Sequence, residues 1–177
     1  MSVPKEFSKL FDSKKVYKQQ CAPQLTLPFS HQQPIVGFCA ETEKDLELLQ
    51  SFLDGVSALK FPLILFWKGS KKPSIDWYDQ VTIATVHDAH YEAMWRACDT
   101  AYCFTEEDVA QAFESGVVPL APKGLKGTEN YDPNKEKGNS FMYEGSGPWV
   151  MFSSLVRAAE TFKFPFDWKC IVRNAKR

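Results

Sequence analysis

The stretch Asp99–Thr128, DTAYCFTEEDVAQAFESGVVPLAPKGLKGT, decides the fold of this chain, because it alternates two short apolar segments with a helix and a glycine-bearing turn. Thr100–Phe104 and Val117–Leu120 are predicted strands. Thr105 precedes three acidic residues that suit the first turn of a helix, and Gly116 is expected to end that helix. This order is typical of an open α/β domain, in which ligands bind where the strands end.

The same alternation begins earlier in the chain. Continuous apolar runs at Pro34–Ala40, Phe61–Trp67 and Val81–Val86 predict three buried strands. Thr42 followed by Asp45 predicts a capped helix between the first two of these strands. The spacing therefore predicts crossover connections between parallel strands.

The remaining elements are also predicted from pattern. Asp88 is expected to cap a helix, Asn139–Tyr143 to form a short strand, and Pro148 to open a helix that runs to Phe162. A last helix is expected from Asp167 to about Lys176. Before Pro34, the region containing residues 14–20 is expected to hold a short helix and a lead-in strand. The prediction is a Rossmann-like three-layer α/β domain, with a mainly parallel sheet and helices on both faces.

The length of 177 residues and a hydrophobic content of 44% suit one domain with a full core. We divide it into a lead-in segment (residues 1–33), a nucleotide-sugar-binding-type domain (residues 34–164) and a C-terminal helix packed on the same domain (residues 165–177). A formal net charge of -1 offers no broad basic face, which argues against nucleic acid and membrane partners.

Targeting and redox signals point to the cytoplasm. No apolar run is long enough to span a bilayer, and the N-terminal sequence lacks the apolar core of a secretory signal. The five cysteines are scattered and form no Cys-x-x-Cys pair, so we expect buried thiols. A redox role for Cys98 and Cys103, which flank a predicted strand, is the alternative.

Several motifs occur in an order and at a spacing that resemble one family. They are Lys14–Leu27, Pro34–Leu49, Val117–Leu120, Gly124–Thr128, Gly138–Phe141, Leu155–Ala158, and Trp168 with Arg173–Ala175. Together they resemble the C-terminal, nucleotide-sugar-binding half of a GT-B glycosyltransferase, most closely the glycogen and starch synthase family. The resemblance covers nearly the whole chain and implies a GT-B half-domain.

The resemblance also implies a ligand and a site. The donor would be UDP- or ADP-glucose and a glucan would be a possible partner, with no cofactor and no metal. Either Glu106 or Glu107 would correspond to the glutamate that touches the transferred sugar. Contacts to the donor phosphates would come from a second group of residues: Lys44, Gly124, Leu125, Gly127 and Thr128.

The chain departs from the family in the loop Cys39–Lys44, where the family's phosphate-binding arginine is absent and only Lys44 corresponds to its lysine. A GT-B enzyme closes two domains over the donor, and the acceptor half is not encoded here. We therefore expect a donor half-site that is inactive as a transferase without an N-terminal acceptor domain or another protein partner. The alternative is a non-catalytic domain, derived from a glycosyltransferase, that binds carbohydrate or protein.

Each candidate also has a purely structural interpretation. Glu106 and Glu107 suit a helix dipole, and the glycine turn suits a plain turn. His87 and His90 could suggest a metal pair, but a helix start explains them without a third ligand. Trp77 and Tyr78 lie in a polar loop and are predicted to form an exposed platform for a sugar or a partner. A third possibility is an unrelated small-ligand protein that shares only the architecture.

Overall fold

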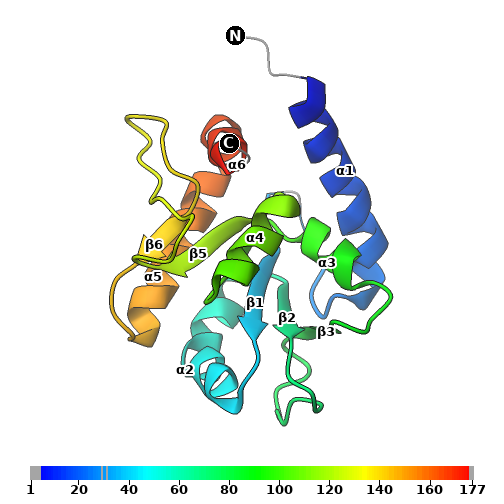
Figure 1. The fold of residues 1–177 in the computed structure, drawn as a ribbon. Helices are drawn as coiled ribbons and strands as arrows, with labels where there is room; N and C mark the ends of the chain where they lie inside the picture. The colour runs from blue at the N-terminus through cyan, green and yellow to red at the C-terminus, as the bar shows by residue number, and fades with distance from the viewer. Residues whose placement is uncertain (1–4, 29, 31, 176–177) are drawn as a thin grey trace.

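The computed structural model describes residues 5–28, 30 and 32–175, and it shows a parallel sheet with helices on both faces (Figure 1). Within these residues six strands lie in the order β3-β2-β1-β4-β5-β6, and each neighbouring pair is parallel. The predicted fold class is confirmed. The strands are β1 (Val36–Ala40), β2 (Leu63–Trp67), β3 (Thr82–Thr85), β4 (Thr100–Tyr102), β5 (Val118–Pro122) and β6 (Phe141–Tyr143).

Helices connect most of the strands and follow the last one. They are α1 (Lys5–Cys21), a 3-10 turn (Ala22–Gln24), α2 (Glu43–Ala58), α3 (Tyr91–Ala97), α4 (Glu106–Glu114), α5 (Pro148–Phe162) and α6 (Pro165–Asn174). None of the helices in the described ranges is long and apolar enough to cross a membrane.

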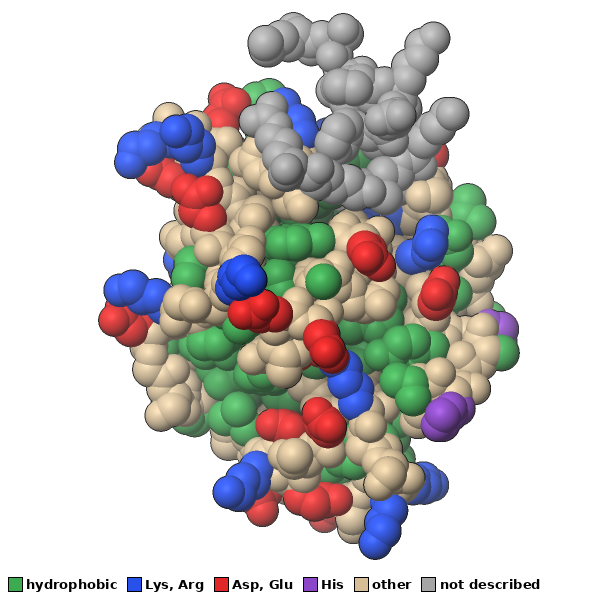
Figure 2. Space-filling model, in the orientation of Figure 1, with side chains coloured by type: hydrophobic (Ala, Val, Ile, Leu, Met, Phe, Trp, Pro, Cys, Tyr) green, Lys and Arg blue, Asp and Glu red, His purple; other side chains and the backbone are tan. Residues whose placement is uncertain are grey.

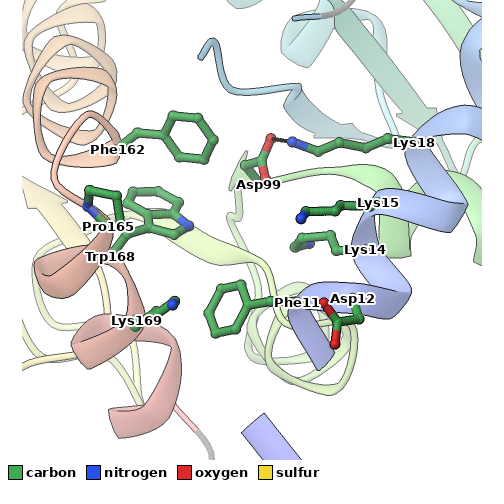
Figure 3. A pocket seen from close by; sticks show the side chains of 10 residues that line it. All are labelled: Phe11, Asp12, Lys14, Lys15, Lys18, Asp99, Phe162, Pro165, Trp168 and Lys169. Carbon is green, nitrogen blue, oxygen red and sulfur yellow. Dashed lines mark ion pairs between the residues drawn. The ribbon is translucent and has the colours of Figure 1, made fainter. Parts of the chain in front are cut away.

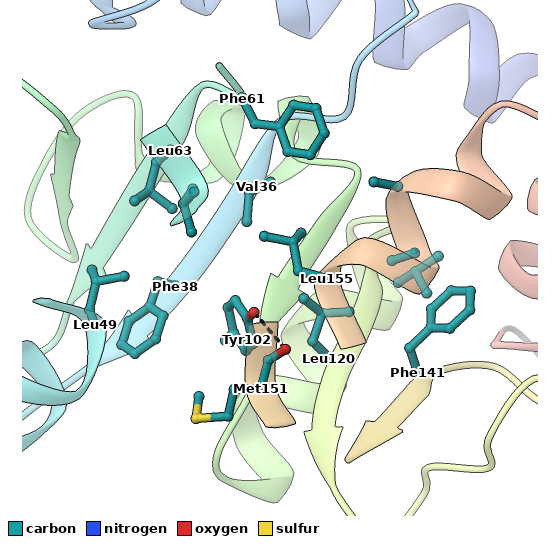
Figure 4. Packing of buried hydrophobic residues seen from close by; sticks show 14 of the residues in the cluster. Val36, Phe38, Leu49, Phe61, Leu63, Tyr102, Leu120, Phe141, Met151 and Leu155 are labelled. Carbon is teal, nitrogen blue, oxygen red and sulfur yellow. Dashed lines mark hydrogen bonds between the residues drawn. The ribbon is translucent and has the colours of Figure 1, made fainter. Parts of the chain in front are cut away.

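Two apolar cores cover the two faces of the sheet. One core joins the sheet to α2, α5 and α6 (Figure 4), and the other joins it to α1, α3 and α4. In the first core the Phe38 and Tyr102 rings lie 5.5 Å apart, and the Tyr102 hydroxyl donates a hydrogen bond to the Met151 carbonyl at 2.9 Å. In the second, the Phe66 ring stacks on Trp95 at 4.1 Å. The continuous apolar runs in the sequence follow from this burial on both faces.

Two predictions about local structure are wrong. The region before Pro34 forms a long helix, α1, and a 3-10 turn, and its described residues include no strand. Helix α3 begins at Tyr91 after His90, whereas Asp88 accepts a hydrogen bond from the Thr85 amide at 2.6 Å and stabilises the turn before the helix. A carboxylate after a strand suits either role, so the sequence did not distinguish them.

The strand order reverses between β1 and β4. The chain leaves β1 toward α2 on one face and leaves β4 toward α4 on the other, so the two helix starts flank one point at the carboxyl ends of the strands. In doubly wound folds this switch point is where ligands bind. The predicted donor site is therefore expected at this edge of the sheet.

Candidate functional site

At the start of α2, the Asp45 carboxylate binds the two amides that precede the helix. Asp45 Oδ2 accepts hydrogen bonds from the Glu41 amide at 3.0 Å and from the Thr42 amide at 2.8 Å. The predicted capping box is thus present. These amides are already satisfied, so they are not available to a phosphate.

The start of α4 repeats this arrangement with a buried carboxylate. Asp108 Oδ2 accepts hydrogen bonds from the Phe104 and Thr105 amides, each at 3.0 Å, and the Thr105 hydroxyl accepts one from the Asp108 amide at 3.1 Å. Lys68, which follows β2, forms an ion pair with Asp108 Oδ1. Because Lys68 follows β2 and Asp108 lies in α4, the ion pair ties α4 to the centre of the sheet.

The pKa of Asp108 reflects two opposing effects. Burial raises the pKa of this carboxyl. The hydrogen bond and positive charge of Lys68 lower the pKa, as do the hydrogen bonds from the Phe104 and Thr105 amides, and together they outweigh burial. The pKa of Asp108 therefore lies below its ordinary value, and the group is a carboxylate at neutral pH.

An aromatic ring lies at the switch point itself. Phe104 follows β4, and its ring centroid lies 5.2 Å from that of Phe38 in an edge-on arrangement. Phe104 is half-buried and packs against both cores. The ring therefore fills part of the crevice between the starts of α2 and α4.

The predicted catalytic candidates lie beside the glycine turn. Glu106 and Glu107 are both exposed in the first turn of α4. The Glu106 carboxylate is 3.8 Å from the Lys126 ammonium, so α4 and the turn are neighbours. This contact is as consistent with a surface ion pair as with a remnant of a sugar-binding glutamate.

The turn Gly124–Thr128 leaves several backbone amides without a hydrogen-bond acceptor among the described residues. Gly124 and Gly127 have φ values of +93° and +83°, a region that favours glycine. The Thr128 hydroxyl and amide both donate to the Leu125 carbonyl, at 2.6 and 3.2 Å, and Leu125 packs against the core beneath. The amides of Gly124, Lys126 and Gly127 have no acceptor among the described residues.

Lys44 lies apart from the other predicted donor contacts. It is an exposed residue in the first turn of α2, which covers the face of the sheet opposite α4. No hydrogen bond or ion pair in the described part of the chain joins Lys44 to the turn. The structure thus brings Glu106 and the turn together but does not link Lys44 to them.

Neither thiols nor imidazoles form a reactive centre in the described regions. All five cysteines are free and buried, and burial, followed by a hydrogen bond with Cys103, raises the pKa of the Cys39 thiol well above its ordinary value. His87 and His90 are exposed, and no group of three or more metal-ligating side chains is found in the part of the chain described.

The predicted aromatic platform is half wrong. Trp77 is only 6% exposed and belongs to the core on the α2 face, whereas Tyr78 is 40% exposed and donates a hydrogen bond to the Pro73 carbonyl at 2.8 Å. Trp149, at the start of α5, is 72% exposed instead. Its position after Pro148 gave no signal of exposure, since a helix start can face either way. Figure 2 shows acidic and basic side chains interspersed on the face drawn.

The fold has a clear structural relative. A scan against protein-family models and a search of curated proteins found no match. Among solved structures, the catalytic domain of starch synthase IV from Arabidopsis thaliana, bound to ADP and acarbose, matches with a TM-score of 0.74 and 17% sequence identity. The match covers 92% of this chain and 38% of that one. At this identity the likeness concerns the fold, and it confirms that the chain has the Rossmann-like architecture of one half of a GT-B glycosyltransferase.

Proposed function

We propose that this chain is a glycosyltransferase-like domain that does not transfer hexose by itself and that acts by binding a carbohydrate or a protein. One observation carries the proposal: Asp45 and Asp108 bind the amides that precede both helix starts of the switch point. A diphosphate placed there would meet two carboxylates that the chain itself holds in position.

The local charge supports the same conclusion. Four acidic side chains, Glu41, Glu43, Glu106 and Glu107, are exposed around the two helix starts. Lys68, a partly buried cation of this edge, is already paired with Asp108. Transfer of a sugar from a nucleotide needs cations that offset the charge of the leaving diphosphate, and this edge offers them poorly.

The extent of the chain bears on catalysis as well. The chain spans 38% of the starch synthase catalytic domain. Glycosyl transfer requires an oriented acceptor and exclusion of water, which a complementary domain would have to supply. We infer that any transferase activity depends on such a partner.

The exposed Trp149 is the best candidate for a contact with a glucan. Its ring is 72% exposed and is held edge-on by the half-buried Phe152 at 6.0 Å. A fixed, exposed indole provides a flat apolar surface on which a sugar ring stacks. The starch synthase that shares the fold binds acarbose, which makes malto-oligosaccharides the natural probe.

A second candidate function is weak binding of UDP- or ADP-glucose at the turn Gly124–Thr128. The free amides of Gly124, Lys126 and Gly127 and the exposed Lys126 side chain favour it. The starch synthase relative binds ADP. Such a site would lack the helix-start contacts, so we expect affinities only in the millimolar range.

Amide NMR of the 177-residue chain separates these functions. We expect maltoheptaose to shift residues around Trp149, and we expect Trp149→Ser to abolish those shifts while Phe166→Ser, which removes another exposed ring, leaves them. ADP and UDP, free or linked to glucose, should shift only the turn. Tight nucleotide binding with shifts at residues 41–45 and 104–108, or glucose transfer by the chain alone, would overturn the proposal.

A further inference from the structure

A cavity of about 400 Å³ lies at the opposite end of the sheet from the predicted donor site. It opens between α1 and α6, beside Asp99, which immediately precedes β4 (Figure 3). Pockets that hold small ligands have volumes of roughly 300–1,000 Å³. The cavity is therefore large enough for a small organic molecule.

Three aromatic side chains form the apolar part of the wall. Phe162 and Trp168 meet edge to face at 5.0 Å, and Phe11 lies across from them on α1. Trp168 is only 4% exposed, and its Nε1–H has no hydrogen-bond acceptor among the described residues. Figure 3 shows this nitrogen on the side of the indole that faces α1. An unpaired buried donor is costly, so a ligand that accepts its hydrogen bond would be favoured.

The charged part of the wall has more lysine than aspartate. Among the residues whose side chains the structure describes, four lysines and two aspartates line the cavity. Lys18 and Asp99 neutralise each other at 2.6 Å, and Asp99 also accepts a hydrogen bond from the Ile35 amide at 2.8 Å. Beyond this internal pair, three lysines face one aspartate, Asp12. The cavity therefore favours a negative charge.

Two of the lysines are exposed enough to reach a ligand without disturbing the fold. Lys15 extends from α1 toward the cavity and has no ion-pair partner among the described residues (Figure 3). Lys169, on α6, lies 5.6 Å from the centroid of the Phe11 ring. Lys14, in contrast, is buried and donates to the Arg96 carbonyl at 3.2 Å, which gives it a structural role.

From this arrangement we propose that the cavity between α1 and α6 binds a small aromatic anion. The ring lies among Phe11, Phe162 and Trp168, and the anionic group lies near Lys15 and Lys169. Aromatic walls match an aromatic ring in shape and polarisability, and the surplus lysines match its charge. This site is separate from the sugar-binding role proposed above, because it lies at the other edge of the sheet.

Naphthoate and its neutral analogue naphthamide test the proposal on the full chain. The five tryptophans give indole N–H signals in nitrogen–proton correlation spectra, and the Trp168→Phe variant identifies the signal of Trp168. We expect naphthoate to shift that signal in a saturable way and to bind more tightly than naphthamide. Neutralising both exposed lysines, in Lys15→Gln with Lys169→Gln, should weaken naphthoate binding about tenfold, because two exposed charge contacts together reach that size.

Lys126→Gln is the matched control, since it removes one exposed lysine at the opposite edge of the sheet. It should leave naphthoate binding unchanged. Equal binding of naphthoate and naphthamide, equal loss in the control variant, or no shift of the Trp168 signal at millimolar naphthoate would each overturn the proposal. None of these outcomes bears on glucan binding at Trp149, so the two proposals stand or fall separately.

Discussion

The two ends of the sheet each hold a buried aspartate paired with a lysine, but they use the pair differently. At the carboxyl ends, Asp108 binds Lys68 and two backbone amides and thereby caps the start of α4. At the amino ends, Asp99 binds Lys18 and the Ile35 amide beside an open cavity. The carboxyl edge thus presents carboxylates that already bind backbone amides, while the amino edge holds a cavity with more lysine than aspartate.

The difference shows that a fold and its ligand site can be separated. The strand order still creates a switch point between β1 and β4, as doubly wound sheets do. At this point Asp45 and Asp108 nevertheless accept hydrogen bonds from backbone amides, and the Phe104 ring packs against Phe38. The fold alone therefore does not show what this edge binds.

The largest effect is expected at the amino edge, from Asp99→Ala. This change leaves Lys18, whose side chain is only 6% exposed, without its counter-charge and leaves the Ile35 amide without an acceptor. Breaking a buried pair in this way costs about 3–5 kcal/mol. Urea unfolding measures the loss. Glu144→Ala, which breaks the exposed pair with Lys123, is the control and should cost about 0–1 kcal/mol; a similar loss in both variants would contradict the role given to Asp99.

The carboxyl edge should respond less strongly to Asp108→Ala. The change removes a helix cap and the charge partner of Lys68, which is 26% exposed and so retains some hydration. We expect a loss of about 2–3 kcal/mol in unfolding free energy. Asp45→Ala removes the equivalent but more exposed cap of α2 and should cost only about 1 kcal/mol.

The same variant tests whether Asp108 occupies an anion site. With the carboxylate gone, the Phe104 and Thr105 amides and Lys68 become available. We expect Asp108→Ala to bind inorganic phosphate more tightly than the natural chain does, as thermal stabilisation by phosphate would show. If phosphate stabilises both proteins equally, the Asp108 carboxylate is not what excludes the anion.

A smaller effect is expected from acid. Because the folded pKa of Asp108 lies below the ordinary value of 3.8, this carboxylate contributes stability above that pH and loses it as the pH falls through the folded pKa. The stability difference between the natural chain and Asp108→Asn should therefore be full at neutral pH and shrink below about pH 4. Unfolding curves across this range give the difference, and one that grew toward acid would contradict the sign.

The smallest effect is expected at the turn, from Gly124→Ala. A methyl group there meets no atom within 4 Å, so the cost comes from the φ of +93° alone and should be about 1 kcal/mol. Gly145→Ala is matched, since Gly145 has a φ of +103° and equally open surroundings. Both variants should lose similar stability in thermal melts, and only Gly124→Ala should alter the nucleotide-induced shifts of the turn.

The features that the sequence predicted well depend on neighbours along the chain. The capping boxes of Thr42 with Asp45 and of Thr105 with Asp108 each involve residues three positions apart. The apolar runs likewise marked β1 and β2, because strands buried on both faces cannot tolerate polar side chains. Such local signals were sufficient to predict the fold class.

The features that the sequence missed depend on which strands lie side by side. Trp77 has polar neighbours in sequence but packs into the core on the α2 face. Lys68 contacts Asp108, 40 residues later in the sequence, because only β1 lies between β2 and β4 in the sheet. Neither contact leaves a periodic pattern in the sequence, so neither could be predicted from it.

The sequence by itself thus determined most of the secondary structure, the parallel sheet and the caps of α2 and α4, since these follow from hydrophobic period and short-range hydrogen bonds. Only the tertiary structure decided that Lys68 pairs with the Asp108 cap of α4 and that a cavity lies between α1 and α6. The two helices that form the cavity come from opposite ends of the chain. Packing alone brings them together, and no local rule encodes the space that remains between them.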